Sequence, residues 1–274
     1  MLKIDFPWLH TQAKDGKTKI TLHKLEKALG SIKGKTKVIV IKGYQKFPLR
    51  LGNFRIWLNP NNEIASLDIY TEIFRENHHA ILPNFSGKDD EVIIDLGANE
   101  GFYTLKVKEN SPKAKVIAVE PNPEAFKVLG RNLKLNNLKN VSLVNKAITS
   151  RDGKVSFEIE EGVTEIGGLK IVGKRKWLDK KRLKKIVVGS LTLESLCKKC
   201  KVNKIDLLKI DVEGAELEIL KSSKNVFNNV KKVVVEYHSE NLRRQIRKFM
   251  VKIGFVVVFE EKKACGNIYF VRST

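Results

Sequence analysis

The chain has 274 residues, 42% of them hydrophobic, which suffices for one large α/β domain with an appendage. No apolar run approaches the roughly 18 residues that cross a membrane, and the N-terminus lacks the pattern of a signal peptide, so we expect a cytoplasmic protein. The formal net charge of +21 favours a polyanionic partner, most simply nucleic acid or otherwise an anionic membrane surface. The alternative explanation of this charge is the lysine-rich surface of a thermophile protein.

Residues 1–88 are predicted to form an N-terminal α+β extension packed on the main domain. We expect a helix near residues 22–29, a strand at 36–42, a hairpin at 47–59 and a helix at 66–82. His78 and His79 fall on the last of these helices and are expected at the surface.

From residue 91 onwards, apolar runs that end in turn residues alternate with helical patterns. The expected strands are 91–97, 115–121, 141–148, 205–212 and 230–238, and the expected helices are 102–110, 122–137, 191–200, 213–223 and 241–254. This alternation predicts a doubly wound, Rossmann-like α/β domain over residues 89–274, with a mostly parallel sheet and helices on both faces. Residues 152–160 suggest a side strand, and the two last strands suggest an antiparallel hairpin at one edge.

A strongly basic segment interrupts this pattern at about residues 161–190. From Lys170 to Lys185 it has nine basic residues and one acid, and we expect an exposed insertion, part helix or part loop. Such a segment could contact several phosphates, and its tryptophan could stack on a base. The candidate substrate-binding residues are Lys174, Arg175, Lys176, Trp177, Lys181 and Arg182.

The first strand of the main domain ends in the glycine turn DLGANEG, residues 95–101. Gly97 and Gly101 would let the backbone pass close to a ligand at a helix N-terminus. The spacing is not the G-x-G-x-x-G of dinucleotide sites, and Glu100 in the turn would repel a pyrophosphate. Glu120, 19 residues after Gly101, is placed to accept two ribose hydroxyls. A nucleoside with an amino-acid tail and no phosphate fits best, and we predict S-adenosylmethionine as the cofactor.

Several segments of the main domain resemble the FkbM family of methyltransferases: DLGANEGFYTL, VIAVEPNPEAFKVLGRNLKLNN, NKAI, DGKVSF and LLKIDVEGAELEIL. The resemblance covers roughly residues 67–240 and implies a class I methyltransferase fold. It also implies methyl transfer from S-adenosylmethionine, mainly to hydroxyl oxygens of sugars and natural products. By resemblance, Asp95, Gly97 and Asn99 lie along the methionine end of the cofactor, Glu120 holds its ribose, and Asn145 to Ala147 lie near its adenine. The basic insertion is not a feature that we associate with the family.

The candidate catalytic residues follow two neighbouring strands. Lys209, Asp211 and Glu213 alternate, which by strand period places them on one face. Asp211 is the first candidate for positioning the acceptor or removing its proton, Glu213 is either a second such group or a helix cap, and His238 ends the next strand. Glu236 alternates with His238, and together with Asp211 they could form a base constellation or a weak metal site.

We assign no metal ligands from the sequence. Cys197 and Cys200 form a C-x-x-C, but no second pair or suitably spaced histidines accompany it. We expect buried thiols, with a disulfide as the alternative.

Three functions remain open on these observations. The charge and the insertion favour a methyltransferase that acts on tRNA or rRNA, at a base nitrogen or a ribose hydroxyl. The family resemblance implies an O-methyltransferase that acts on a sugar or another small hydroxyl compound. A non-enzymatic RNA-binding module is disfavoured because it would not need Asp95 and Glu120. The oligomeric state is not predicted.

Overall fold

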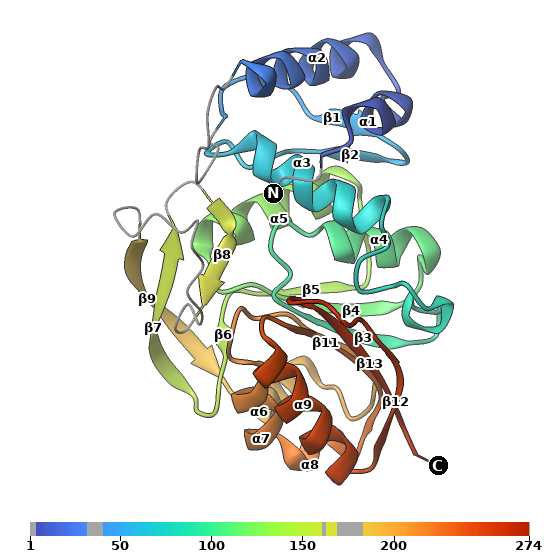
Figure 1. Ribbon diagram of the computed structural model, residues 1–274, viewed down its shortest axis with the longest axis vertical. Coiled ribbons are helices and arrows are strands. Elements are labelled where there is room, and N and C mark those ends of the chain that lie inside the picture. The colour runs from blue at the N-terminus through green and yellow to red at the C-terminus, as the bar shows by residue number, and fades with distance from the viewer. Residues whose placement is uncertain (1–3, 32–40, 161–162, 169–182, 274) are drawn as a thin grey trace.

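A seven-stranded sheet forms the centre of the protein (Figure 1). The computed structural model describes residues 4–31, 41–160, 163–168 and 183–273. The strand order is β12-β13-β11-β10-β3-β4-β5. Its strands are β3 (Val92–Leu96), β4 (Lys115–Val119), β5 (Val141–Val144), β10 (Ile205–Ile210), β11 (Val230–Tyr237), β12 (Phe255–Glu260) and β13 (Gly266–Arg272).

Helices cover both faces of this sheet, because its strands are apolar on both sides. Ile93 and Leu207 belong to one hydrophobic cluster, and their neighbours Ile94 and Leu208 belong to the other. The first cluster packs against α3 (Glu63–Phe74), α4 (Phe102–Asn110) and α5 (Pro123–Leu135). The second packs against α6 (Leu193–Cys200), α7 (Glu216–Ser222), α8 (Lys224–Phe227) and α9 (Glu240–Lys252). The predicted doubly wound, Rossmann-like fold is therefore confirmed.

The C-terminal hairpin lies at one edge of the sheet, as predicted, with its second strand on the inner side. β13 pairs antiparallel with β11 on one side and with β12 on the other. β12 is therefore the edge strand and runs in the same direction as the five parallel strands, so that only β13 is reversed. The sequence predicts the hairpin itself, but the order of its two strands depends on long-range pairing.

A second sheet of four strands, in the order β6-β9-β7-β8, stands beside the main one. It consists of β6 (Ala147–Ile148), β7 (Gly153–Glu160), β8 (Val163–Gly168) and β9 (Leu183–Leu191). The predicted strand 141–148 is thus two strands in different sheets. Residues 183–190, expected as helix or loop, form a strand that pairs antiparallel with β7.

The N-terminal part lies over α3 and α5 (Figure 1). It contains α1 (Phe6–Gln12), α2 (Gly16–Gly30) and the hairpin β1 (Leu49–Leu51) and β2 (Phe54–Ile56). The short helix η1 (Pro83–Phe85) follows α3 and contacts the main sheet instead, because the Asn84 carbonyl accepts from Lys232 of β11. Trp57 N–H and Arg55 N–H donate to the Asn132 and Asn136 side chains of the helical segment at α5, and both parts share one hydrophobic cluster. The boundary at residue 88 stays a prediction, and most of the expected strand 36–42 lies outside the described residues.

The predicted helix 66–82 ends early, at Phe74. Asn77 and His79 have left-handed backbones, with φ of 53° and 65°, which a helix cannot accommodate. His78 and His79 therefore lie on a loop, and the expectation that they are surface residues of a helix is wrong, because His79 is only 2% exposed.

Two smaller findings bear on the sequence predictions. Within the described ranges, no helix is both long and apolar enough to span a bilayer. The Cys197 and Cys200 thiols are free rather than joined in a disulfide, and burial raises the pKa of Cys197 to about 11.

Gly97 is required by the protein backbone itself. Its φ is +79°, and a Cβ atom here would lie 1.7 Å from the carbonyl oxygen of Asp211. The turn after β3 and the end of β10 are held together at this point, since Asp211 N–H donates to the Leu96 carbonyl over 3.1 Å. The sequence predicts that the Gly97 backbone passes close to a ligand. The close contact that the structure shows is with the end of β10, another strand of the same sheet.

We expect Gly97→Ala to lower the free energy of unfolding by about 3 kcal/mol or more, because both the backbone angle and the contact with Asp211 are unfavourable for a side chain. Urea denaturation measures this change. Gly30→Ala is the control, because Gly30 is helical with no atom near the added methyl group, so its effect should stay within about 1 kcal/mol of zero. Equal stability of the two variants would contradict this account of Gly97.

Candidate active site

A cavity opens at the carboxyl ends of β3, β4, β5 and β10. This is the edge at which doubly wound sheets bind ligands. The cavity is lined by Leu96, Gly97, Asn99, Val119, Glu120, Pro121, Asn122, Lys146, Ala147, Ile148, Phe157, Asp211, Val212, Glu213 and Ala215.

Glu120 is held at the wall of this cavity by two backbone groups. Its Oε2 accepts from Asn99 N–H over 2.9 Å, and its Oε1 accepts from Asn122 N–H over 2.7 Å. Burial raises the pKa of Glu120 to about 7, and these two hydrogen bonds limit the rise. Each oxygen keeps a lone pair for a further donor, so the carboxylate can accept the two hydroxyls of a ribose.

Asp95 lies beneath the glycine turn and does not line the cavity. It is fully buried, accepts from the Thr104 hydroxyl over 2.9 Å and pairs with Lys209 Nζ at 3.1 Å. Lys209 also donates to the Gly97 carbonyl over 2.8 Å and lies 3.4 Å from Asp211 Oδ2. Burial alone would lower the pKa of Lys209, but the two aspartates hold it above its ordinary value. Lys209, on β10, is thus linked to β3 by an ion pair and to the glycine turn by a hydrogen bond.

Asp211 is the carboxylate that reaches the cavity from the end of β10, and its side chain is 21% exposed. Its Oδ2 lies 3.5 Å from His79 Nε2 as well as close to Lys209. Burial alone would raise the pKa of Asp211, but Lys209 and His79 hold it well below its usual range. Asp211 is therefore ionised and accepts hydrogen bonds at neutral pH.

The three predicted catalytic residues, Asp211, Glu213 and His238, are brought together. One ligand atom of each lies within 4.8 Å of those of the other two. His238 Nε2 lies 3.6 Å from Glu213 and 3.4 Å from Glu216. Burial would lower the pKa of His238, but Glu213 and Glu216 raise it to about 12, so the ring is protonated and has no lone pair for a proton. Glu216 is fully buried.

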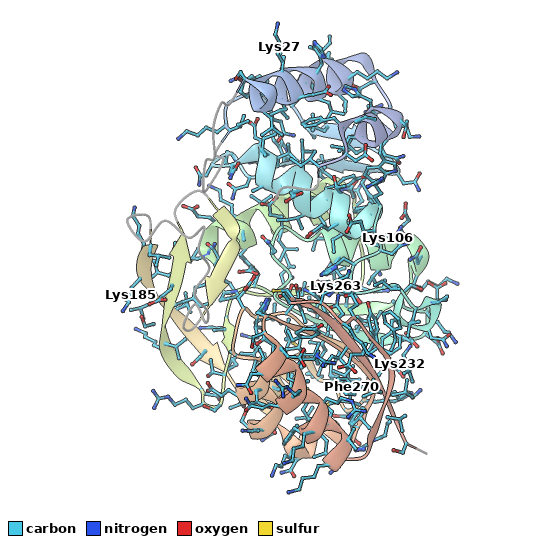
Figure 2. All side chains as sticks on the ribbon, viewed as in Figure 1. Lys27, Lys106, Lys185, Lys232, Lys263 and Phe270 are labelled. Carbon is cyan, nitrogen blue, oxygen red and sulfur yellow. The ribbon has the colours of Figure 1, made fainter. Side chains whose placement is uncertain are left out.

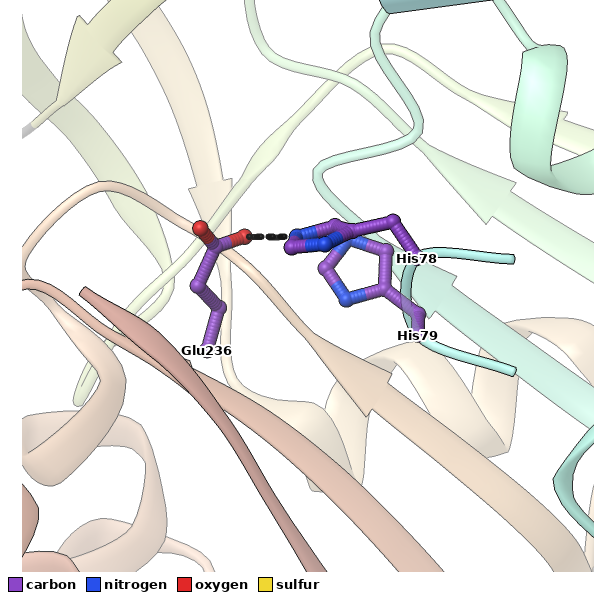
Figure 3. Close-up of side chains that lie close together, drawn as sticks. All are labelled: His78, His79 and Glu236. Carbon is purple, nitrogen blue, oxygen red and sulfur yellow. Dashed lines mark hydrogen bonds and ion pairs between the residues drawn. The ribbon is translucent and has the colours of Figure 1, made fainter. Parts of the chain in front are cut away.

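The sequence misses a second cluster beside Asp211, formed by His78, His79 and Glu236 (Figure 3). Glu236 Oε2 lies 3.5 Å from His78 Nε2 and 3.7 Å from His79 Nε2. Burial would lower the pKa of His78, but Glu236 raises it to about 9, while burial and the neighbouring His78 lower the pKa of His79. The available signals were the paired histidines and the position of Glu236 at a strand end.

The predicted cofactor residues divide into two groups. Gly97, Asn99, Glu120 and Ala147 line the cavity, whereas Asp95, Gly101 and Asn145 do not. Asn145 donates to the Glu120 carbonyl over 2.7 Å and so fixes the end of β4 from behind. Gly101 begins α4, and a Cβ there would meet Leu129 at 2.5 Å.

One prediction from the sequence is wrong, and another stays a prediction. Glu100 is fully buried and outside the cavity lining, so it does not repel a phosphate there as we expected. The candidate substrate-binding residues Lys174, Arg175, Lys176, Trp177, Lys181 and Arg182 all lie outside the described residues.

The residues present fit S-adenosylmethionine. Apolar side chains of Ala147, Ile148 and Phe157 offer a slot for adenine, and Glu120 offers acceptors for the ribose. The Asn99 Oδ1 atom is buried at the cavity without a hydrogen-bond partner, which suits a ligand carrying an ammonium group.

The positive charge of the described residues is dispersed. Figure 2 shows Lys27 on α2, Lys185 on β9 and Lys232 on β11 at widely separated parts of the molecule. Lysines spread in this way resemble a solvated surface more than a single nucleic-acid footprint.

Comparisons with known proteins agree with the resemblance seen in the sequence. The model of the methyltransferase FkbM domain matches residues 95–268. The chain is 31% identical over 221 residues to methyltransferase sdnD of Sordaria araneosa, covering 71% of this chain and 83% of that protein. It is 25% identical over 173 residues to the 2-O-methyltransferase NoeI of Sinorhizobium fredii, covering 60% and 70%. It is 30% identical over 152 residues to the hexuronic acid methyltransferase AglP of Haloferax volcanii, covering 56% and 58%.

We expect Lys209→Met to lower the free energy of unfolding by about 3–5 kcal/mol, because Asp95 and Asp211 would lose the cation between them. Urea denaturation at pH 7 measures the loss, and adding Asp95→Asn should recover part of it. Lys185→Met is the matched control. Its pair with Glu158 is at the surface, with 75% of the lysine side chain exposed, and should contribute less than about 1 kcal/mol. A loss no larger than that of the control would mean that the buried pair does not hold the site together.

Proposed function

The chain belongs to the FkbM family of S-adenosylmethionine-dependent methyltransferases, and we propose that it methylates a hydroxyl oxygen of a sugar or another small hydroxylated compound. The observation that carries the proposal is the ionised Asp211 carboxylate on the wall of the same cavity as Glu120. It places a hydrogen-bond acceptor for a hydroxyl group beside the expected cofactor.

The relatives support this choice of acceptor. One is named a 2-O-methyltransferase and another a hexuronic acid methyltransferase, and both names indicate hydroxylated substrates. They favour the small-molecule alternative over the RNA substrate that the net charge suggests.

When bound, S-adenosylmethionine supplies a methyl group on a positively charged sulfur that leaves as a neutral thioether once the acceptor oxygen has taken the methyl. Glu120 and the apolar slot position the nucleoside, and Asn99 receives the ammonium end. Asp211 accepts the hydrogen bond of the acceptor hydroxyl and orients its oxygen towards the methyl group. A carboxylate with so low a pKa is a weak base, so the hydroxyl needs a second group nearby to release its proton.

The direct test is transfer of labelled methyl from S-adenosylmethionine to a panel of neutral sugars, uronic acids and nuclease-treated or untreated RNA. We expect label in a sugar or small-molecule fraction, with the product carrying an O-methyl group by mass spectrometry. Label that appears only in nuclease-sensitive material would reject the proposal in favour of an RNA substrate.

Asp211→Asn tests the residue assigned to the acceptor. We expect turnover to fall by about 100-fold or more, because the hydroxyl loses a charged acceptor, while affinity for S-adenosylhomocysteine changes little. Asp90→Asn, at an exposed position, is the control and should leave both quantities unchanged. Equal turnover in the two variants would remove Asp211 from the mechanism.

Glu120 makes cofactor affinity depend on pH. Its pKa is about 7 without ligand, and only the ionised form accepts two ribose hydroxyls, so affinity for S-adenosylhomocysteine should fall roughly tenfold per pH unit below 7 and level off above it. The other charges that act on Glu120 are those of Asp95 and of Lys209, whose pKa is held above its ordinary value. Isothermal titration calorimetry measures the profile, and Glu120→Gln should bind more weakly with no slope. The same pH dependence of affinity in Glu120→Gln would mean that another group causes it.

A further inference from the structure

We propose that His78, His79 and Glu236 form a binding site for a divalent transition metal ion such as Zn²⁺, beside the cavity at Asp211. The three side chains come from two distant parts of the chain: the loop after α3 and the end of β11 (Figure 3). The sequence analysis groups Glu236 with His238 and Asp211 as a possible metal site, but neither it nor the names of the relatives assign an ion to His78 and His79.

The ring of His79 is oriented by Asn267. Its Nδ1 lies 2.8 Å from Asn267 Oδ1. The orientation of the Asn267 amide is itself fixed, because its Nδ2 donates to Glu261 over 3.0 Å. The Asn267 oxygen therefore faces the ring, so His79 Nδ1 carries the hydrogen and the neutral ring has a bare lone pair on Nε2.

This nitrogen lies near acceptors instead of donors. His79 Nε2 lies 3.5 Å from Asp211 Oδ2 and 3.7 Å from Glu236 Oε2, both of which are carboxylate oxygens. Three acceptors that converge in a mostly buried place repel one another unless a cation lies among them. Lys209 contacts Asp211 from one side, but no cation among the described side chains contacts both His79 Nε2 and Glu236.

The distances between the possible ligand atoms also suit a metal ion. The ligand atoms of His78, His79 and Glu236 lie within 4.8 Å of one another, and two of these separations are 3.5 and 3.7 Å. Ligand atoms about 2.0–2.2 Å from a tetrahedral ion lie roughly 3.3–3.6 Å apart. A small inward movement of these side chains therefore gives metal-ligand distances. Two imidazoles and one carboxylate suit Zn²⁺ and similar borderline ions rather than Mg²⁺ or Ca²⁺.

Residues around the possible ligands hold them in position. A metal-binding histidine usually donates its other N–H to an oxygen that fixes the ring, and Asn267 does this for His79. His79 also has a left-handed backbone, with φ of 65°, which is uncommon for a residue with a side chain and clusters at functional sites. Figure 3 shows both rings beside the Glu236 carboxylate, so the loop presents two imidazoles to one acid.

A simpler explanation accounts for only part of this arrangement. A proton on His78 would make an ordinary ion pair with Glu236, at 3.5 Å. It would leave His79 Nε2 facing two carboxylates, whereas an ion bound in place of that proton satisfies all three groups.

The ion would act on the substrate, and this part of the inference rests on the proposed function. Asp211 lines the cavity and lies 3.5 Å from His79, so the ion would lie next to the place assigned to the acceptor hydroxyl. Three protein ligands would leave a fourth position open, as in catalytic zinc sites, and a hydroxyl held there would pass its proton to the Asp211 carboxylate more easily. This supplies the second group that the weak base Asp211 requires.

Metal binding is tested on the full chain without cofactor or substrate. The protein is treated with EDTA, freed of chelator and titrated with Zn²⁺, Mn²⁺ or Co²⁺ by calorimetry, with the melting temperature as a second readout. We expect one equivalent of Zn²⁺ to bind and to raise the melting temperature, and Co²⁺ to give the visible absorption of a tetrahedral site. Glu236→Gln and His78→Ala should each weaken binding by about 100-fold or more.

Two further variants locate the ion. His23→Ala removes an exposed histidine of α2 and should change nothing. His238→Ala tests the neighbouring group of Asp211, Glu213 and His238, and should retain most of the affinity. The proposal fails if no ion binds, if Glu236→Gln binds as the wild type does, or if His238→Ala alone abolishes binding. Because no methyl transfer is measured, any of these results leaves the proposed O-methyltransferase activity standing, and a failed transfer assay leaves the metal site standing.

Discussion

The site depends on two buried ion pairs that share one lysine: Lys209 with Asp95 and Lys209 with Asp211. Each of the three groups would be costly to bury alone, and together they connect two neighbouring strands with the turn that follows the first. The turn carries Asn99, and Asn99 N–H in turn fixes the carboxylate of Glu120 on the next strand. The cavity wall is therefore set by a chain of contacts that begins with one lysine in the middle of the sheet.

The same arrangement explains how two carboxylates of one cavity differ in chemistry. Among the described side chains no cation contacts the buried Glu120, so its pKa is raised, whereas Asp211 lies between Lys209 and His79 and keeps its charge. The group proposed to accept the ribose hydroxyls and the group proposed to orient the acceptor thus have separate electrostatic surroundings within one pocket.

Much of the main domain could be predicted from the sequence because its signals are local. Short apolar runs that end in turn residues give the strands, and Glu120 and Asp211 follow directly at strand ends, where ligands bind. The errors arise where a local pattern has no information about distant partners. The pattern of residues 66–82 looks helical throughout, yet the loop at His78 and His79 is fixed by Glu236 and Asn267, which are 158 and 189 positions away from His78. The strand expected at 141–148 divides because its two ends pair in different sheets.

The position of β13 has a consequence for how the protein is made. This strand lies between β11 and β12, and its residue Asn267 fixes the ring of His79, 188 positions earlier in the chain. A nascent chain can form most of the parallel sheet as its strands leave the ribosome, but this part of the site must wait until the final strand has been synthesised and has inserted. The contact that orients His79 is therefore made in a late step, after most of the strands around the cavity have been synthesised.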